Sequence, residues 1–178
     1  MQNQDTQNRP IAHLVNWQDL EHFEILGPTI EFLTETQISP CIMRGTVPPG
    51  AFIPLHSHDD PETFVQISGE FEGLSEAAGD FTWLRIRPGD VFHVPPNARH
   101  AFRNRFSEPA VSIIVTTPKL AGLLKAISVP ASVAAPGTSS ISPERVRQAL
   151  ATAESFGYWN ASPEENARVG LADGRNLP

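Results

Sequence analysis

The sequence predicts an all-β fold with a helical extension at its C-terminal end. Between about residues 22 and 117, short stretches rich in Val, Ile, Phe, Thr and Trp alternate with Gly, Pro, Asn and Asp, which is the pattern of antiparallel strands. No amphipathic helix separates these stretches, so the alternating pattern of a doubly wound α/β sheet is excluded. A sandwich, a jelly roll or a barrel remains.

Seven stretches are predicted as strands, and their turns agree with this. Gly69 supplies the positive φ of a tight hairpin, Gly89 suits the third position of a type II turn, and Asn97 tolerates the left-handed region. The predicted strands are TIEFLTE (29–35), CIMRGTV (41–47), TFVQI (63–67), EFEGLSE (70–76), FTWLRIR (81–87), DVFHV (90–94) and AVSIIVT (110–116).

After Thr117 the sequence becomes helical. PKLAGLLKAI (118–127) and the stretch 143–159 are predicted helices, and the small-residue, proline-containing stretch 128–143 between them is a predicted linker. Ser162, Pro163 and Glu165 predict a further helix that begins with a capping box. We therefore expect an N-terminal arm with edge strands (1–35), a barrel core (36–117) and a helical extension (118–178) that packs on the barrel or on a partner subunit.

Composition limits the classes of partner and location. A length of 178 residues suits one folded domain, and the formal net charge of −7 opposes binding to nucleic acid or to anionic lipid. The apolar runs are too short to span a bilayer. The polar start MQNQDTQNRP has no signal-like apolar region, and the single cysteine, Cys41, cannot form an internal disulfide. A cytoplasmic location is expected.

Histidine and glutamate side chains predict a metal site. Side chains alternate along a strand, so His56 and His58 project from one face and can chelate one ion. Glu62 and His100 lie on later strands, so three imidazoles and a carboxylate can converge inside a barrel. Such donors suit one divalent transition metal: iron, manganese, nickel, copper or zinc. His93 lies outside the ligand spacing, and it is expected to be packed or to orient a ligand.

Two motifs resemble those of the cupin superfamily. The first matches at Gly50, His56, His58, Glu62 and Gly69; the second matches at Gly89, Pro95, His100 and Asn104, with Asn97 where the family has glycine. The resemblance implies a jelly-roll β-barrel in which His56, His58, Glu62 and His100 are the metal ligands. HAFRN (100–104) and the tail from ISPERV (141–146) are similar in particular to single-domain cupins related to quercetin dioxygenases.

Apolar side chains share strand faces with the predicted ligands. Phe52, Phe64 and Phe102 are candidates to line a substrate pocket, with Gln66 as its polar group; plain core packing is an equally good interpretation of each phenylalanine. Trp83, Tyr158 and Trp159 are expected to be core or interface contacts.

Two classes of function follow. The first is a metal-dependent, dioxygenase-like oxidoreductase acting on an apolar or aromatic small molecule, in which Glu62 is also the base, as the related dioxygenases imply. The alternatives are a non-catalytic module that binds a small molecule, or a metal-dependent isomerase. The resemblance suggests a homodimer that covers exposed edge strands.

Overall fold

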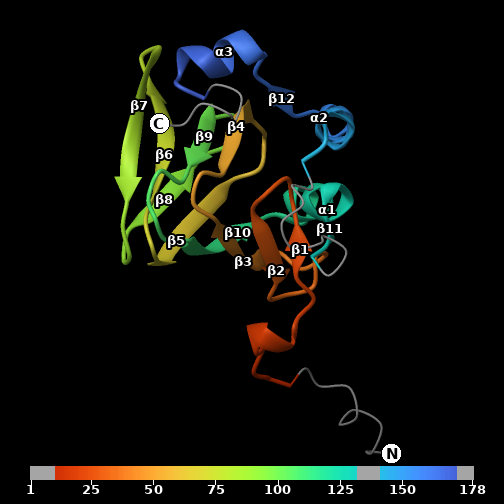
Figure 1. Ribbon diagram of the computed structural model, residues 1–178. Coiled ribbons are helices and arrows are strands. Elements are labelled where there is room, and N and C mark those ends of the chain that lie inside the picture. The colour runs from red at the N-terminus through yellow and green to blue at the C-terminus, as the bar shows by residue number, and fades with distance from the viewer. Residues whose placement is uncertain (1–10, 132–140, 172–178) are drawn as a thin grey trace, which may run out of the picture.

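The chain forms two antiparallel sheets that face each other across one interior (Figure 1). The computed structural model describes residues 11–131 and 141–171. Within these residues the larger sheet has the strand order β11 (Val129–Pro130), β1 (Phe23–Glu24), β2 (Thr29–Phe32), β3 (Cys41–Val47), β10 (Ala110–Thr116), β5 (Glu62–Ser68) and β8 (Val91–Val94). The smaller sheet has the order β12 (Trp159–Asn160), β4 (Phe52–Ser57), β9 (His100–Arg103), β6 (Phe71–Ala77) and β7 (Asp80–Ile86). The prediction of an all-β jelly roll is confirmed.

The turn residues behave as the sequence predicts. Gly69, Gly89 and Asn97 all have positive φ, at 64°, 92° and 66°. Asn97 therefore takes the backbone conformation of the glycine that it replaces in the second motif. The hairpin between β5 and β6 and the turns before β8 and β9 are formed as expected.

The helices begin where the capping residues predict. They are α1 (Pro118–Ile127), α2 (Pro143–Ser155) and α3 (Pro163–Arg168), preceded near the N-terminus by a short 3-10 turn at Trp17–Asp19. The side chains of Thr117, Ser142 and Ser162 each accept a hydrogen bond from a first-turn N–H group, and Ser162 and Glu165 form the predicted capping box. None of the helices in the described parts of the chain has the length and apolar character that crossing a membrane requires.

The core between the sheets is apolar and aromatic. It contains Phe64 and Met43 from the larger sheet and Phe71 and Phe102 from the smaller one. The rings of Phe64 and Phe102 lie 4.5 Å apart between centroids. Burial of several such rings is the main source of stability for this part of the fold.

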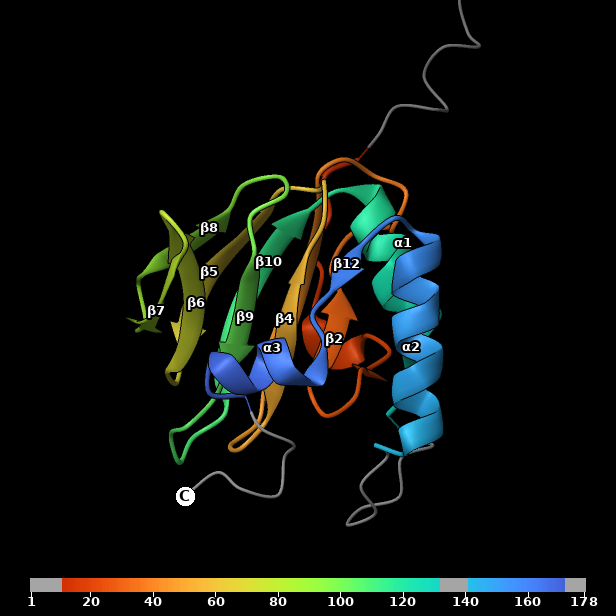
Figure 2. The ribbon, with the colours of Figure 1, turned by 90° about the horizontal axis from the view of Figure 1, so that it is seen from above.

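The C-terminal extension packs against the outside of the smaller sheet and against α1. Figure 2 shows α3 lying across β4 and β9, with β12 running beside β4. Leu55, Leu74 and Ala101 on the outer face of the sheet are buried beneath Leu171. Trp83 packs against the same cluster, and its indole N–H donates to the carbonyl of Val169 at 2.8 Å. The extension thus covers a sheet face that would otherwise be exposed.

A β-bulge in β4 reverses the expected position of Phe52. Phe52 pairs with Arg103 and Ile53 with Phe102, but the register then shifts before His56 pairs with His100. Pro54 lies within this irregularity, as expected of a residue that has no N–H group to donate. Ile53 therefore shares the inner face with His56, whereas Phe52 packs in the outer cluster. The expectation that Phe52 lies beside the ligands is wrong, because the extra residue changes the alternation of the side chains.

Parts of the predictions fall on residues that lie outside the described ranges. These are the polar start at 1–10, most of the linker at 132–140 and the end of the chain at 172–178.

Candidate metal centre

Three histidines converge from two neighbouring strands. His56 is the last residue of β4 that pairs with β9, His58 directly follows the end of β4, and His100 begins β9 opposite His56. One ring nitrogen of each lies within 4.8 Å of the others. His58 and His100 are 3% and 1% exposed, and His56 is partly exposed, so the cluster is nearest to solvent at His56.

Backbone carbonyls fix the orientation of all three rings. The Nδ1 atoms of His56, His58 and His100 lie 2.7, 2.8 and 2.9 Å from the carbonyl oxygens of Pro54, Asp60 and Ala98. A carbonyl oxygen can only accept, so each Nδ1 carries a proton and donates it. In the neutral rings Nε2 keeps its lone pair. Histidines that ligate metal ions are oriented in the same way, with one ring nitrogen donating to a carbonyl and the other available to the ion.

Glu62 completes the donor set from β5. Its Oε2 atom lies 3.7 Å from Nε2 of His58 and 3.7 Å from Nε2 of His100. Burial alone would raise the pKa of Glu62, but His100 and His58 outweigh it and lower that pKa to about 2. Burial together with His100 and His58 lowers the pKa of His56 to about 3. At neutral pH, therefore, Glu62 is anionic and His56 is neutral.

The donor set fits a divalent transition metal. The Nε2 atoms of His58 and His100 are buried and have no hydrogen-bond partner among the described residues. A buried polar atom without a partner is rare, because it loses its hydrogen bond to water and gains none. A metal ion bound between His56, His58, His100 and Glu62 would satisfy these nitrogens and match the ligand types of zinc, iron and related metals.

Comparisons with known proteins agree with this geometry. A family model described as a cupin domain matches residues 43–116, which include all four of the proposed ligands. This part of the chain is a cupin domain. A 3-hydroxyanthranilate 3,4-dioxygenase of Ruegeria pomeroyi is 33% identical over 72 residues, which are 39% of this chain and 39% of that protein. The chain thus matches about two fifths of the length of this curated relative.

Solved structures share the fold of the cupin domain. The polyketide cyclase RemF of Streptomyces resistomycificus has a TM-score of 0.52 and 16% identity over 60% of this chain and 79% of its own. A sugar phosphate isomerase of the cupin superfamily from Silicibacter pomeroyi has a TM-score of 0.51 and 20% identity, covering 59% and 75%. A predicted oxalate decarboxylase of Thermotoga maritima has a TM-score of 0.50 and 19% identity, covering 59% and 98%. At these identities the likeness concerns the fold alone.

Phe64 and Phe102 form an aromatic floor beside the cupin site. Phe102 lies 5.7 Å from His100 between ring centroids, and Phe64 follows Glu62 on the same face of β5. Beyond the rings, the cavity that they line with Ile53, Phe71 and Ile114 holds about 20 Å³, about enough for one water molecule. These two rings therefore fill the interior below the ligands, in agreement with the core-packing interpretation.

Gln66 is held by the protein itself. Its amide Nε2 donates to the carbonyls of Ser68 and Gly69 at 2.7 and 3.0 Å, and its Oε1 accepts from Ser112. Gln66 is 2% exposed. It points inward as expected, but its amide hydrogens are engaged in closing the hairpin between β5 and β6 and not in an open pocket.

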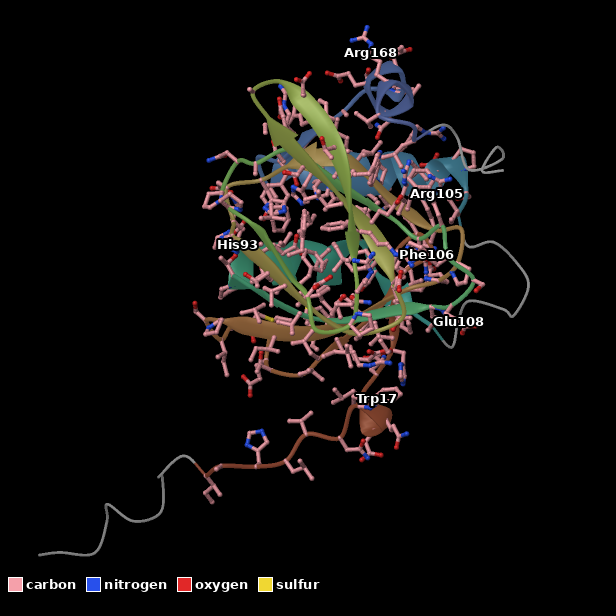
Figure 3. The ribbon with its side chains drawn as sticks, turned by 90° about the vertical axis from the view of Figure 1, so that its left-hand side faces the viewer. Trp17, His93, Arg105, Phe106, Glu108 and Arg168 are labelled. Carbon is pink, nitrogen blue, oxygen red and sulfur yellow. The ribbon has the colours of Figure 1, made fainter. Side chains whose placement is uncertain are left out.

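His93 lies apart from the metal site. Its Nδ1 is 2.9 Å from Oγ1 of Thr63, the residue that it faces across β5 and β8. Because Thr63 and Glu62 are neighbours on one strand, His93 and Glu62 project from opposite faces of the sheet. Figure 3 shows His93 at the edge of the protein body. The absence of His93 from the ligand set agrees with its sequence spacing.

Asp60 and Tyr158 support the site from outside, a link that the sequence did not indicate, although Tyr158 was expected to be a core or interface contact. The Asp60 carbonyl accepts from His58, while its carboxylate accepts hydrogen bonds from the Tyr158 hydroxyl and the Thr117 hydroxyl. Lys119 Nζ lies 3.9 Å from the same carboxylate. The Tyr158 ring lies 5.2 Å from that of His58. Tyr158 is 98 residues from Asp60 in the sequence, so no local pattern could have paired them.

Proposed function

We propose that this protein is a metal-dependent oxygenase that acts on an apolar or aromatic small molecule with an ionisable hydroxyl or enol group. The observation that carries the proposal is the convergence of three imidazoles, each held by a backbone carbonyl at Nδ1, on one buried carboxylate. Among the described residues, Nε2 of His58 and Nε2 of His100 have no hydrogen-bond partner. The similarity to a protein named as a dioxygenase supports the same reaction class.

His56, His58, His100 and Glu62 would hold one divalent ion of iron, manganese, nickel, copper or zinc. When bound, such an ion would act as a Lewis acid that lowers the pKa of a substrate hydroxyl or enol group and brings that group next to molecular oxygen. The partly exposed His56 marks the side from which substrate would approach. Phe64 and Phe102 would keep water away from the inner side of the reacting group.

Glu62 is proposed as both a ligand and the acceptor of the substrate proton. With a pKa near 2 it is ionised at neutral pH, so it can accept a proton, although a carboxylate so strongly stabilised is a weak base. Movement away from His58 and His100 would remove that stabilisation and strengthen the base. The carboxylate therefore has to shift during the proton transfer.

The test is metal analysis followed by oxygen uptake. The purified protein should contain close to one transition-metal ion per chain, and it should consume oxygen with at least one flavonol, diketone or phenol. His58→Ala and His100→Ala should lose the metal, and His93→Ala, which removes an imidazole outside the site, should keep it. Retention of metal by the first two variants would refute the assignment of the ligands.

The same experiment separates the alternatives. A metal-loaded protein that binds panel members without consuming oxygen would support the non-catalytic module. Exchange of a substrate proton with solvent without oxygen uptake would support the isomerase. The homodimer, the cytoplasmic location and the small-molecule partner expected from the sequence stay predictions.

A further inference from the structure

The C-terminal extension contributes a strand to the metal site. Asn160 in β12 pairs with His56 in β4. The Ala161 N–H group donates to the Leu55 carbonyl at 2.9 Å, so Asn160 and His56 form a non-hydrogen-bonded pair, in which side chains approach most closely. Side chains of paired residues lie on the same face of a sheet, and His56 faces the ligand cluster.

The neighbours of Asn160 confirm which way it faces. Trp159 packs with Leu55 in the cluster on the outer face of the smaller sheet. Tyr158, two residues before Asn160, lies against the ring of His58. Because side chains alternate along a strand, Asn160 and Tyr158 are on the side of the histidines and Trp159 is on the opposite side.

The amide nitrogen of Asn160 donates to no group in the described parts of the chain. This Nδ2 atom is buried and has no hydrogen-bond partner among the described residues, as is also true of Nε2 of His58 and His100. A buried donor without a partner is unfavourable and calls for an explanation. Here the unpartnered atoms belong to one region: two are on the ligand histidines, and the third is on the residue paired with the remaining histidine, His56.

We propose that Asn160 is a positioning residue that donates a hydrogen bond from Nδ2 to an oxygen atom of the molecule bound beside His56. This inference rests on the proposed metal site. An enolate, phenolate or carboxylate oxygen carries no proton, so it can accept a hydrogen bond from the amide N–H, whereas a ligand whose coordinating group carries an N–H would set one donor against another. The extension therefore takes part in substrate selection as well as covering the sheet.

The test uses the full chain loaded with Co²⁺. Acetylacetone serves as an enolate probe, and its binding is measured by the change in the visible absorption spectrum of the bound cobalt. Asn160→Leu keeps the size of the side chain and removes its polar atoms; Asn160→Asp keeps the shape and removes the donor. Both variants should bind Co²⁺ in the same one-to-one ratio as the wild type, and both should bind acetylacetone roughly tenfold to a hundredfold more weakly. Ser57→Ala, which alters the outward-facing residue between two ligands, should bind the probe like the wild type.

Each outcome decides the inference. Probe affinity within twofold of the wild type in a folded, cobalt-loaded Asn160→Leu or Asn160→Asp protein would overturn it. Loss of cobalt from both variants, with Ser57→Ala intact, would also overturn it, because Asn160 would then support the metal and not the bound molecule. Binding of the probe that depends on Asn160, in a protein that consumes no oxygen, would support the inference and refute the oxygenase.

Discussion

The Tyr158 hydroxyl in the C-terminal extension donates a hydrogen bond to the carboxylate of Asp60, the residue whose carbonyl holds the ring of His58. Removal of this hydrogen bond should destabilise the protein. Tyr158 and Asp60 are each 5% exposed. Burial and Asp60 raise the pKa of Tyr158 far above its usual value, so its hydroxyl keeps the proton that it donates. Tyr158→Phe removes this donor and leaves the ring against His58 and the helices.

The expected size of the effect follows from the charge and burial of the acceptor. A hydrogen bond to a charged group contributes about 1.5–3 kcal/mol to the free energy of unfolding. Asp60 would keep its hydrogen bond from Thr117 and the nearby ammonium group of Lys119, so the carboxylate would not lose all its partners. For a chain of this length each kcal/mol shifts the melting temperature by about 2–4 °C, so Tyr158→Phe should melt about 3–12 °C lower.

Urea unfolding of the metal-free protein measures this free energy without a contribution from bound metal. Ser155→Ala is the control: it removes an exposed hydrogen bond from Ser155 Oγ to the Thr152 carbonyl at the end of α2, three residues before Tyr158. It should change stability by about 0.5 kcal/mol or less. If Tyr158→Phe is no less stable than Ser155→Ala, the phenol does not stabilise Asp60 and the reasoning is refuted.

Two further predictions concern the site and the fold. Burial would lower the pKa of His58, but Glu62 outweighs it and raises that pKa above 6.5. Because a protonated imidazole cannot bind a metal ion, zinc uptake by the metal-free protein should weaken as the pH falls through this raised pKa. Glu62→Gln should bind zinc less tightly at high pH, but its zinc affinity should begin to fall at a lower pH than that of the wild type, because His58 loses the charge that raises its pKa. Chelator competition between about pH 5 and 8 measures zinc affinity against pH, and an unchanged or higher midpoint of this curve would contradict the prediction. Gly69→Ala should destabilise the protein more than Gly79→Ala in urea unfolding, because both glycines have positive φ but only at Gly69 would a Cβ atom overlap the Pro109 carbonyl. Equal losses would show that this overlap is relieved without cost.

Much of this protein could be predicted from local patterns. Strand, turn and capping signals act over a few residues, so the strands at 41–47 and 110–116 and the helix at 118–127 have the bounds that their sequences predict. The short strands β1, β11 and β12 were not predicted individually, because two-residue pairings leave no alternation to detect. The helix predicted over 143–159 ends at Ser155, and Trp159 lies in β12. The spacing of the histidines made a chelate plausible, and the resemblance of the two motifs to those of cupins implied His56, His58, Glu62 and His100 as the ligands.

Tertiary structure alone decided what surrounds those ligands. The bulge at Pro54 reversed the face of Phe52, an effect that simple alternation cannot anticipate. The positions of Tyr158 and Asn160 beside the histidines depend on how a segment about 100 residues further along the chain packs against β4. Local sequence patterns predict the proposed ligands because His56, Glu62 and His100 lie on strands and His58 directly follows one. Contacts between distant segments determine the supporting residues, since only the folded chain brings these segments together.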